Sequence, residues 1–339
     1  MDGSHFLPPK PWAVTDSMFS HRPVLLDEAL QGLNVAVRPD GLFVDGTYGR
    51  GGHSSAILAA LSPRGRLHAF DQDPQAAADA ARFASEPRFQ FHAANFARMA
   101  EVATAEGFAG KVDGLLLDLG VSSPQLDDAQ RGFSFSHDGP LDMRMNPLAG
   151  ESAAEWLMRA KAEEIADVLF EYGEERNSRR IAARIVESRA ETPLTSTAQL
   201  AALIASVPGP RSHKIHPATR SFQAIRIHIN GELDVLRTAL TASLTLLAPG
   251  GRLAVISFHS LEDRIVKQFL REQGGRREAK DKYAQFSRVE GAESAIPHAP
   301  SATSRLQEID RVFPGEAELA VNPRARSSVL RVAERGAQP

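Results

Sequence analysis

The sequence contains no cysteine among its 339 residues. That absence excludes disulfide bonds, cysteine-ligated zinc or iron–sulfur sites, and a thiol nucleophile. An excess of charge of one sign is also missing, because 39 Lys and Arg residues face 42 Asp and Glu residues, a net charge of -3. A protein coated in nucleic acid would be more basic, so any contact with nucleic acid has to come from a local basic region.

Long hydrophobic runs are absent too. No window approaches the roughly 18–20 apolar residues that cross a bilayer, which argues against a membrane-spanning helix. Residues 1–20 hold three prolines and Asp16, and they lack the apolar run of a signal peptide. We therefore expect a flexible tail over 1–20 and a cytoplasmic protein without a membrane partner.

Short apolar segments alternate with alanine-rich stretches between residues 42 and 119. Strands separated by helices at this spacing favour βαβ units and a parallel sheet covered on both faces. The predicted strands are 42–45, 66–71, 89–92 and 114–118. The predicted helices between them are 54–61, 74–83 and 96–106.

From residue 152 to about residue 247 the pattern is helical only. Breaks in it fall at Gly173, Pro193 and 208–210. An apolar strand follows at 252–258, and segments 306–313 and 328–333 are suited to an antiparallel hairpin. The length also fits two domains in series, but these would leave strand 252–258 without a sheet to join. We therefore predict one doubly wound, Rossmann-like α/β sheet that is interrupted by an inserted all-helical domain.

The strongest functional signal is the glycine-rich segment 45–54, directly after the first predicted strand. Glycines there let the backbone turn tightly and bring a ligand against N–H groups at a helix N-terminus. The segment has no lysine for a phosphate-binding Walker loop, and it matches the dinucleotide fingerprint only in part, with Ser54 at the last glycine position. A glycine turn without a ligand is the alternative interpretation.

Acidic or aromatic residues follow the ends of the predicted strands. In doubly wound folds, an acid at the end of the second strand accepts hydrogen bonds from ribose hydroxyls. Asp71 occupies that place, and the competing Asp73 suits an N-cap of the next helix better. Phe96 follows the third strand and either lines an adenine pocket or packs in the core. Asp118 ends the fourth strand, in the crevice where open α/β sheets bind ligands.

Residues 119–145 are dense in polar and turn-forming residues just past the fourth strand. They include Phe133, Phe135 and an arginine, Arg144, close to two acids. We interpret this segment as a substrate loop, with an ordinary surface loop as the alternative.

Several longer motifs resemble the bacterial 16S rRNA (cytosine-N4)-methyltransferase family. They are, in chain order, 21–28, 45–54, 71–74, 118–126, 131–145, 221–226, 258–264 and 322–327. The resemblance implies a class I methyltransferase sheet that takes its methyl group from S-adenosyl-L-methionine and acts on 16S rRNA, within the small ribosomal subunit. It implies a methyltransferase core over 21–130 and 221–339, and a helical insertion for RNA recognition over 131–220. The cofactor contacts that it implies are Gly51, Gly52, His53, Asp71, Phe96, Asp118 and Gln125.

The implied reaction moves a methyl group from a sulfonium to the exocyclic N4 of cytidine, so the protein mainly has to orient two reactants. Hydrogen-bond acceptors on the amine would localise its lone pair. Many amino-group methyltransferases carry an Asp/Asn/Ser-Pro-Pro-aromatic motif after the fourth strand, whereas this chain has Ser-Ser-Pro-Gln at 122–125. The catalytic groups are therefore open, with Asp118 and Ser122 favoured, and Phe133, Phe135 or Phe258 as apolar partners for the base. The absence of cysteine agrees with this chemistry, because methylation of cytosine at ring carbon 5 generally needs a cysteine adduct.

A local basic region lies between residues 176 and 226, which hold nine Lys and Arg residues against two acids. Such a run is commonly a solvated helix face, but RNA backbone contact is the interpretation we favour. The basic residues are Arg176, Arg179, Arg180, Arg184, Arg189, Arg211, Lys214, Arg220 and Arg226. Arg324 and Arg326 form a smaller basic site near the C-terminus.

Other functions stay open at this level. The same fold serves methyltransferases of DNA amino groups or small molecules, and a cofactor-binding sensor that docks on the ribosome is a third hypothesis. His53, His213, His216, His228 and His259 do not join carboxylates at a recognised ligand spacing, so we expect no metal in the site. The sequence leaves a homodimer open.

Overall fold

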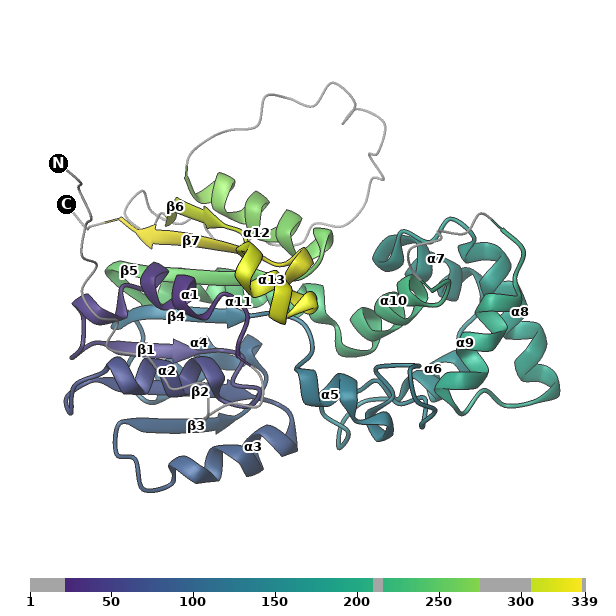
Figure 1. The fold of residues 1–339 in the computed structure, drawn as a ribbon, viewed down its shortest axis with the longest axis horizontal. Helices are drawn as coiled ribbons and strands as arrows, with labels where there is room; N and C mark the ends of the chain where they lie inside the picture. The colour runs from purple at the N-terminus through teal and green to yellow at the C-terminus, as the bar shows by residue number, and fades with distance from the viewer. Residues whose placement is uncertain (1–21, 210–215, 275–305, 337–339) are drawn as a thin grey trace. The chain divides into compact units, whose positions relative to one another are not determined.

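The computed structural model describes residues 22–209, 216–274 and 306–336. The chain divides into two compact units (Figure 1). The first consists of Met1–Asp71, Ala80–Leu119 and Arg237–Pro339, and the second of Gln72–Asp79 and Gly120–Leu236. The tail predicted over 1–20 and most of the polar stretch after residue 271 lie outside the described residues.

A seven-stranded sheet forms the centre of the first unit, with strand order β3-β2-β1-β4-β5-β7-β6 (Figure 1). Its strands are β1 Leu42–Asp45, β2 Arg66–Asp71, β3 Phe89–Ala93, β4 Val112–Asp118, β5 Leu247–Ser257, β6 Leu306–Val312 and β7 Val329–Arg335. Strands β1 to β5 are parallel, β7 runs antiparallel to β5, and β6 runs antiparallel to β7. This order is typical of class I methyltransferases, so the predicted fold class is confirmed.

The apolar runs identified in the sequence become strands because both faces of the sheet are covered. The three leucines of β4, Leu115–Leu117, are fully buried. Two strands begin earlier than predicted, β4 at Val112 and β5 at Leu247. The start of β5 takes in Pro249, and the β4–β5 pairing shifts register between Val112 and Gly114.

Helices α1 (Leu26–Gly32) and α2 (Gly52–Ala60) pack on the sheet through a cluster that includes Leu30, Phe43 and Ile57. The other helices of this unit are α4 Met99–Ala105, α12 Ser260–Gln273 and α13 Glu316–Val321. In sequence, α3 Pro74–Ala80 and α11 Glu232–Leu246 run across the division into the second unit. Short 3-10 turns cover Val35–Val37, Ala81–Phe83, Phe96–Arg98, Ala129–Arg131 and Pro323–Ser327. Among the described helices, none is long and apolar enough to cross a membrane.

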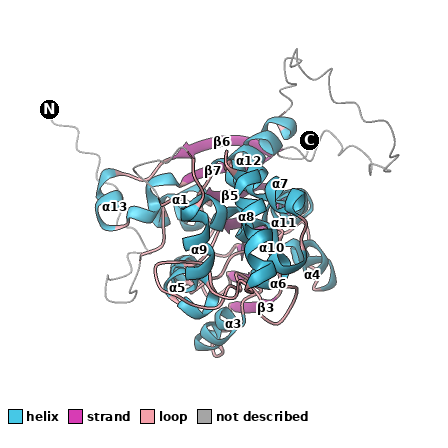
Figure 2. Cartoon of the chain, turned by 90° about the vertical axis from the view of Figure 1, so that its right-hand side faces the viewer, coloured by secondary structure: helices cyan, strands magenta, loops and turns pink. Residues whose placement is uncertain are grey.

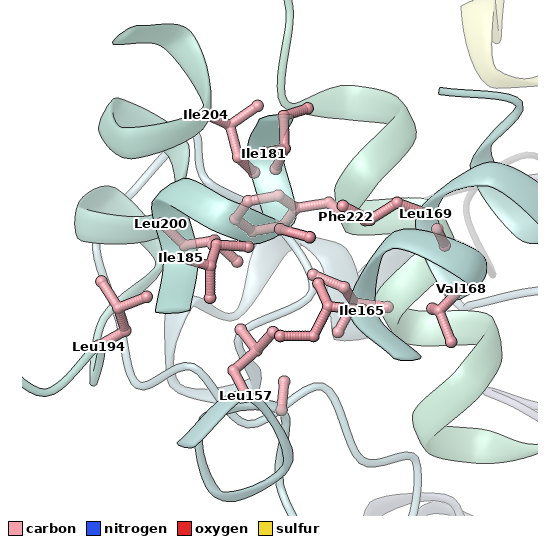
Figure 3. Packing of buried hydrophobic residues seen from close by; sticks show 14 of the residues in the cluster. Leu157, Ile165, Val168, Leu169, Ile181, Ile185, Leu194, Leu200, Ile204 and Phe222 are labelled. Atoms are coloured by element: carbon pink, nitrogen blue, oxygen red, sulfur yellow. The ribbon is translucent and has the colours of Figure 1, made fainter. Parts of the chain in front are cut away.

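Helices and loops build the second unit (Figure 2). Its helices are α5 Ser123–Asp127, α6 Ala153–Arg159, α7 Ala162–Gly173, α8 Ser178–Glu191, α9 Thr197–Ser206 and α10 Thr219–Asn230. Their apolar faces meet in one core around Leu169, Ile185 and Phe222 (Figure 3). Helix α7 ends at Gly173, as predicted, where a Cβ would meet the Arg220 carbonyl oxygen at 2.7 Å. The all-helical insertion is confirmed, while its predicted limits, 131–220, and its role in RNA recognition stay predictions.

Candidate functional site at the carboxyl edge of the sheet

Three parallel strands of the first unit end in acids. Asp45 ends β1, Asp71 ends β2 and Asp118 ends β4. Because β2, β1 and β4 are neighbouring parallel strands, the three carboxylates lie at one edge of the sheet. The glycine-rich segment 45–54 leaves the same edge and enters α2. The structure therefore brings these parts of the predicted site together.

Gly51 and Gly52 form a tightly packed turn before α2. Gly51 has φ +67°, and a Cβ there would lie 2.6 Å from the Tyr48 ring. A Cβ on Gly52 would lie 2.3 Å from Cγ of Pro23. Side chains are thus excluded at both positions, and the first N–H groups of α2, which have no intrahelical partner, are available to a ligand.

Asp71 connects the end of β2 to this turn, because its Oδ2 accepts a hydrogen bond from the Gly49 N–H at 2.8 Å. Asp73 makes different contacts. Its Oδ1 accepts from the Gln75 N–H at 2.9 Å, as expected for an N-cap of α3, and its Oδ2 accepts from Arg131 at 2.7 Å. Asp73 is buried and serves the structure. Contact of Asp71 with ribose hydroxyls stays a prediction.

Buried His53 and partly buried Asp118 form a polar pair at this edge. His53 Nδ1 lies 3.5 Å from Asp118 Oδ2. Within the described part of the chain, the other polar atoms of the pair, His53 Nε2 and Asp118 Oδ1, are buried without a hydrogen-bond partner. Buried polar atoms nearly always have a partner, so these two atoms fit a site that holds a polar ligand.

Burial controls the protonation of this pair. It raises the pKa of Asp118 well above its ordinary value, and the neighbouring charges of Asp45 and Glu262 raise it further. Burial also raises the pKa of Asp45, although a hydrogen bond from Ser54 opposes the shift. The pKa of His53 falls to about 4, again through burial. His53 is therefore neutral at neutral pH, and Asp118 takes up a proton more readily than an ordinary aspartate.

Two polar residues, one at the end of β5 and one in α12, were not singled out from the sequence. Glu262 in α12 is buried, and its carboxylate accepts hydrogen bonds from the N–H groups of Phe258 and His259 at 2.8 and 3.3 Å. Ser257 ends β5, and its buried hydroxyl has no partner among the described residues. Motif 258–264 contributed to the family resemblance. A glutamate three residues after a histidine is a weak capping signal, however, so the sequence did not predict that Glu262 caps α12.

Phe96 begins the 3-10 turn after β3, and Asn95 caps that turn by accepting a hydrogen bond from the Ala97 N–H at 2.9 Å. The Phe96 side chain is partly exposed in the first unit. Its contact with the cofactor stays a prediction.

Ser122 and Gln125 belong to the second unit, where they fix the start of α5. The Ser122 N–H donates to Gln125 Oε1 at 2.9 Å, and Gln125 Nε2 donates to Asp73 Oδ2 at 2.8 Å. Both ends of the Gln125 amide are thus engaged inside this unit. The cofactor contact of Gln125 and the catalytic role of Ser122 stay predictions.

Arg131 organises the loop that we interpreted as the substrate loop. It forms a buried ion pair with Asp73 and donates hydrogen bonds to the carbonyls of Arg144 and Met145, at 3.1 and 2.9 Å. The Met145 N–H in turn donates to Asn230 at 2.7 Å. Buried and partly buried polar contacts within the second unit therefore hold this loop in place.

The two aromatic residues of this loop pack inside the same unit. Phe133 belongs to the hydrophobic core, and Phe135 lies edge-on to Phe222 at 4.7 Å between ring centroids. Phe258 of the first unit packs, partly buried, on the cluster of α1 and α2. The structure thus accounts for these rings by packing, and their role as partners of the target base stays a prediction.

Some side chains of the basic region are exposed, and others form ion pairs within the protein. Arg176, Arg179, Arg180 and Arg184 are exposed, and Arg180 and Arg184 line a groove of about 570 Å³ between α8 and the end of α9. Arg226 is instead paired with Glu232 at 2.8 Å, within the second unit. Arg211 and Lys214 lie outside the described residues.

Comparison with known proteins identifies the chain. Residues 18–336 match the model of the MraW methylase family. The chain belongs to this family. A relative, ribosomal RNA small subunit methyltransferase H of Thioalkalivibrio sulfidiphilus, is 58% identical over 320 residues, which cover 93% of this chain and 97% of the relative. The predicted enzyme class, an S-adenosylmethionine-dependent methyltransferase, is confirmed by this membership.

Solved structures similar to this MraW-family chain include two methyltransferases. N-methyltransferase NodS from Bradyrhizobium japonicum, in complex with S-adenosyl-L-homocysteine, has a TM-score of 0.38 at 10% identity, covering 96% of this chain and 95% of that chain. An rRNA methylase from Streptococcus thermophilus has a TM-score of 0.34 at 12% identity, covering 91% and 95%. With TM-scores this low, neither similarity carries an argument about function.

Proposed function

We propose that the chain transfers a methyl group from S-adenosylmethionine to the exocyclic N4 of a cytidine in 16S rRNA of the small ribosomal subunit, in the cytoplasm. The observation that carries this proposal is the 58% identity, over nearly the full length of both chains, to a ribosomal RNA small subunit methyltransferase H. The polar edge of the sheet supports it, because it holds the acid at the end of β2, the glycine turn and the carboxylate of Asp118 in one unit.

The residues at this edge fit the methyl donor. Asp71 would accept hydrogen bonds from the ribose hydroxyls, and the turn at Gly51 and Gly52 would admit the ligand close to the backbone. The unpartnered atoms of His53 and Asp118 offer it polar contacts. The bound donor supplies an activated methyl group on a sulfonium.

Asp118 is suited to act on the amine that receives the methyl group. A carboxylate oxygen that accepts a hydrogen bond from the N4 amine localises the nitrogen lone pair and disperses the charge that develops on it. Its raised pKa makes Asp118 a better proton acceptor than an ordinary aspartate, so it can take the proton that the methylated amine loses. His53, neutral and 3.5 Å away, orients the carboxylate.

The helical unit supplies the RNA contacts of this proposal. The target base has to leave its stack to be methylated. Residues other than those that hold the base therefore have to bind the phosphates around it. The exposed arginines of α8 provide positive charge for them, next to the groove that Arg180 and Arg184 line.

The decisive experiment incubates the protein with labelled S-adenosylmethionine and small ribosomal subunits that lack this modification. Nucleoside mass spectrometry of the recovered 16S rRNA is expected to show N4-methylcytidine. Label in DNA or in a small molecule, with none in rRNA, would instead support the alternative substrates. Binding of S-adenosylmethionine without any transfer would support the sensor hypothesis.

A further inference from the structure

A second polar cluster lies within the first unit, on strands β2 and β3 and after α4. His68 of β2 pairs in register with Gln90 of β3, and Phe70 pairs with His92. Because side chains alternate along a strand, His68, Phe70, Gln90 and His92 all point to the same face of the sheet. Glu106 directly follows α4 and reaches this face.

Three residues with potential metal-ligand atoms meet there. His68 Nδ1 lies 3.0 Å from His92 Nε2, and Glu106 oxygens lie 3.7 Å from His68 Nδ1 and 3.6 Å from His92 Nδ1. One ligand atom from each residue can be chosen so that all lie within 4.8 Å of one another. Ligands of a tetrahedral zinc ion are about 3.3 Å apart, given bonds of roughly 2.0 Å. The three residues therefore lie close enough together to enclose such an ion once their side chains adjust.

The surroundings hold these side chains in place. The His68 ring packs on Phe108 at 4.1 Å and the His92 ring on Phe70 at 4.4 Å between centroids. Gln90 Nε2 donates hydrogen bonds to both Glu106 oxygens, at 3.2 and 3.1 Å. A hydrogen-bond partner of this kind orients the residue that binds the metal, and such partners are typical of metal sites.

We propose that His68, His92 and Glu106 bind a divalent zinc-class metal ion, with water as the fourth ligand. Two imidazoles and a carboxylate form a donor set that suits zinc. The Glu106 side chain is 34% exposed, which leaves a route for the ion and room for the water. The ion would tie the edge strand β3 to β2 and α4, and it would take no part in methyl transfer.

Calorimetric titration of the untagged, chelator-treated full chain with Zn²⁺ at neutral pH tests this site. One ion per chain is expected to bind saturably, with affinity about tenfold or more weaker in Glu106→Gln and in His92→Gln. Glu101→Gln is the matched control, because Glu101 is exposed in α4 and forms a surface ion pair with Arg98, so this variant should bind as the unchanged protein does.

Spectroscopy and thermal melts separate metal binding from folding effects. Co²⁺ in place of Zn²⁺ is expected to give the intense visible absorption of tetrahedral coordination, and both site variants should lose it. Zn²⁺ should raise the Tm of the unchanged protein and of Glu101→Gln, but not that of the site variants. Equal binding by all four proteins, or no saturable binding by the unchanged protein, would overturn the proposal. The Tm without metal shows whether a variant is folded.

Discussion

Asp118 is held where its charge is unfavourable. Its pKa is raised in the folded chain, so the folded state binds a proton more tightly than the unfolded state does. The resulting cost to stability is absent below the ordinary pKa of 3.8 and grows as pH rises toward the folded-state pKa. A protein that keeps such a residue gains something other than stability from it, which agrees with a role in the site.

Replacing Asp118 by Asn removes that cost together with the proton acceptor. We expect the Tm of Asp118→Asn, without cofactor, to exceed that of the unchanged protein at mildly alkaline pH, with a smaller difference at mildly acidic pH. Single-turnover methyl transfer should fall by roughly a hundredfold, as when a general base is lost. Asp167→Asn, on the exposed surface of α7, is the control and should change neither quantity. An unchanged transfer rate would remove Asp118 from the mechanism.

Asp71 is expected to matter for binding of the cofactor. A carboxylate that accepts hydrogen bonds from ribose hydroxyls is worth about 1.5–3 kcal/mol, so Asp71→Ala should weaken S-adenosylmethionine binding by about tenfold or more. Calorimetry measures this affinity directly. Glu163→Ala, an exposed acid of α7, should leave it unchanged. Equal affinity of Asp71→Ala and the unchanged protein would show that another group holds the ribose.

At the scale of elements, the junction between β1 and α2 depends on close packing. A methyl group on Gly52 would overlap Pro23, so Gly52→Ala has to displace the chain before α1 or the start of α2. We expect a loss of about 1–3 kcal/mol in the free energy of unfolding, measured by denaturant titration, and weaker cofactor binding. Gly315→Ala is the matched control, because no atom lies within 4 Å of its new methyl group. Gly315→Ala should therefore keep the stability and the cofactor affinity of the unchanged protein. Equal losses in the two variants would contradict the prediction.

In the second unit, the buried ion pair of Asp73 and Arg131 holds the loop after β4. Removing Asp73 leaves the Arg131 guanidinium buried without its counter-charge, so Asp73→Ala should lower the free energy of unfolding by about 3–5 kcal/mol. Arg98→Ala, which breaks an exposed ion pair, should cost less than about 1 kcal/mol. Denaturant titrations of both variants test this. If the two losses are similar, the buried pair does not organise the loop.

These elements show which parts of the fold and of the site could be predicted from the sequence. The strands were predictable because a parallel sheet buries both faces and its strands are short apolar runs, and the glycine turn because only glycine fits there. The contacts of Arg131 with Asp73, and of His68 with Glu106, join residues that lie far apart in sequence, and no local pattern reports them. Helix α12 was missed for a different reason. Glu262 accepts hydrogen bonds from the N–H groups of Phe258 and His259, only four and three residues before it, and a histidine N-cap is a weak capping signal in the sequence.

For the whole molecule, the net charge conceals an uneven distribution. The total of -3 averages the exposed arginines of α8 with acids elsewhere in the chain. Of the basic residues counted between 176 and 226, Arg226 forms an ion pair inside the second unit and Arg184 pairs with Glu187 on the surface. Among the described residues of this region, the charge available to RNA is therefore smaller than the sequence count suggests, and Arg179 and Arg180 of α8 are exposed.

The combined replacement of Arg179, Arg180 and Arg184 by Ala tests whether α8 contacts RNA. Each arginine that neutralises a phosphate releases counterions, so binding to small subunits should weaken and the slope of log affinity against log salt should fall by roughly 0.7–0.9 per lost contact. Replacing Lys267 and Arg271, exposed on α12, gives a control with a similar loss of charge. Equal losses in both variants would indicate a general charge effect. A change in the α8 variant alone, with S-adenosylmethionine affinity unchanged, would place the RNA on the helical unit.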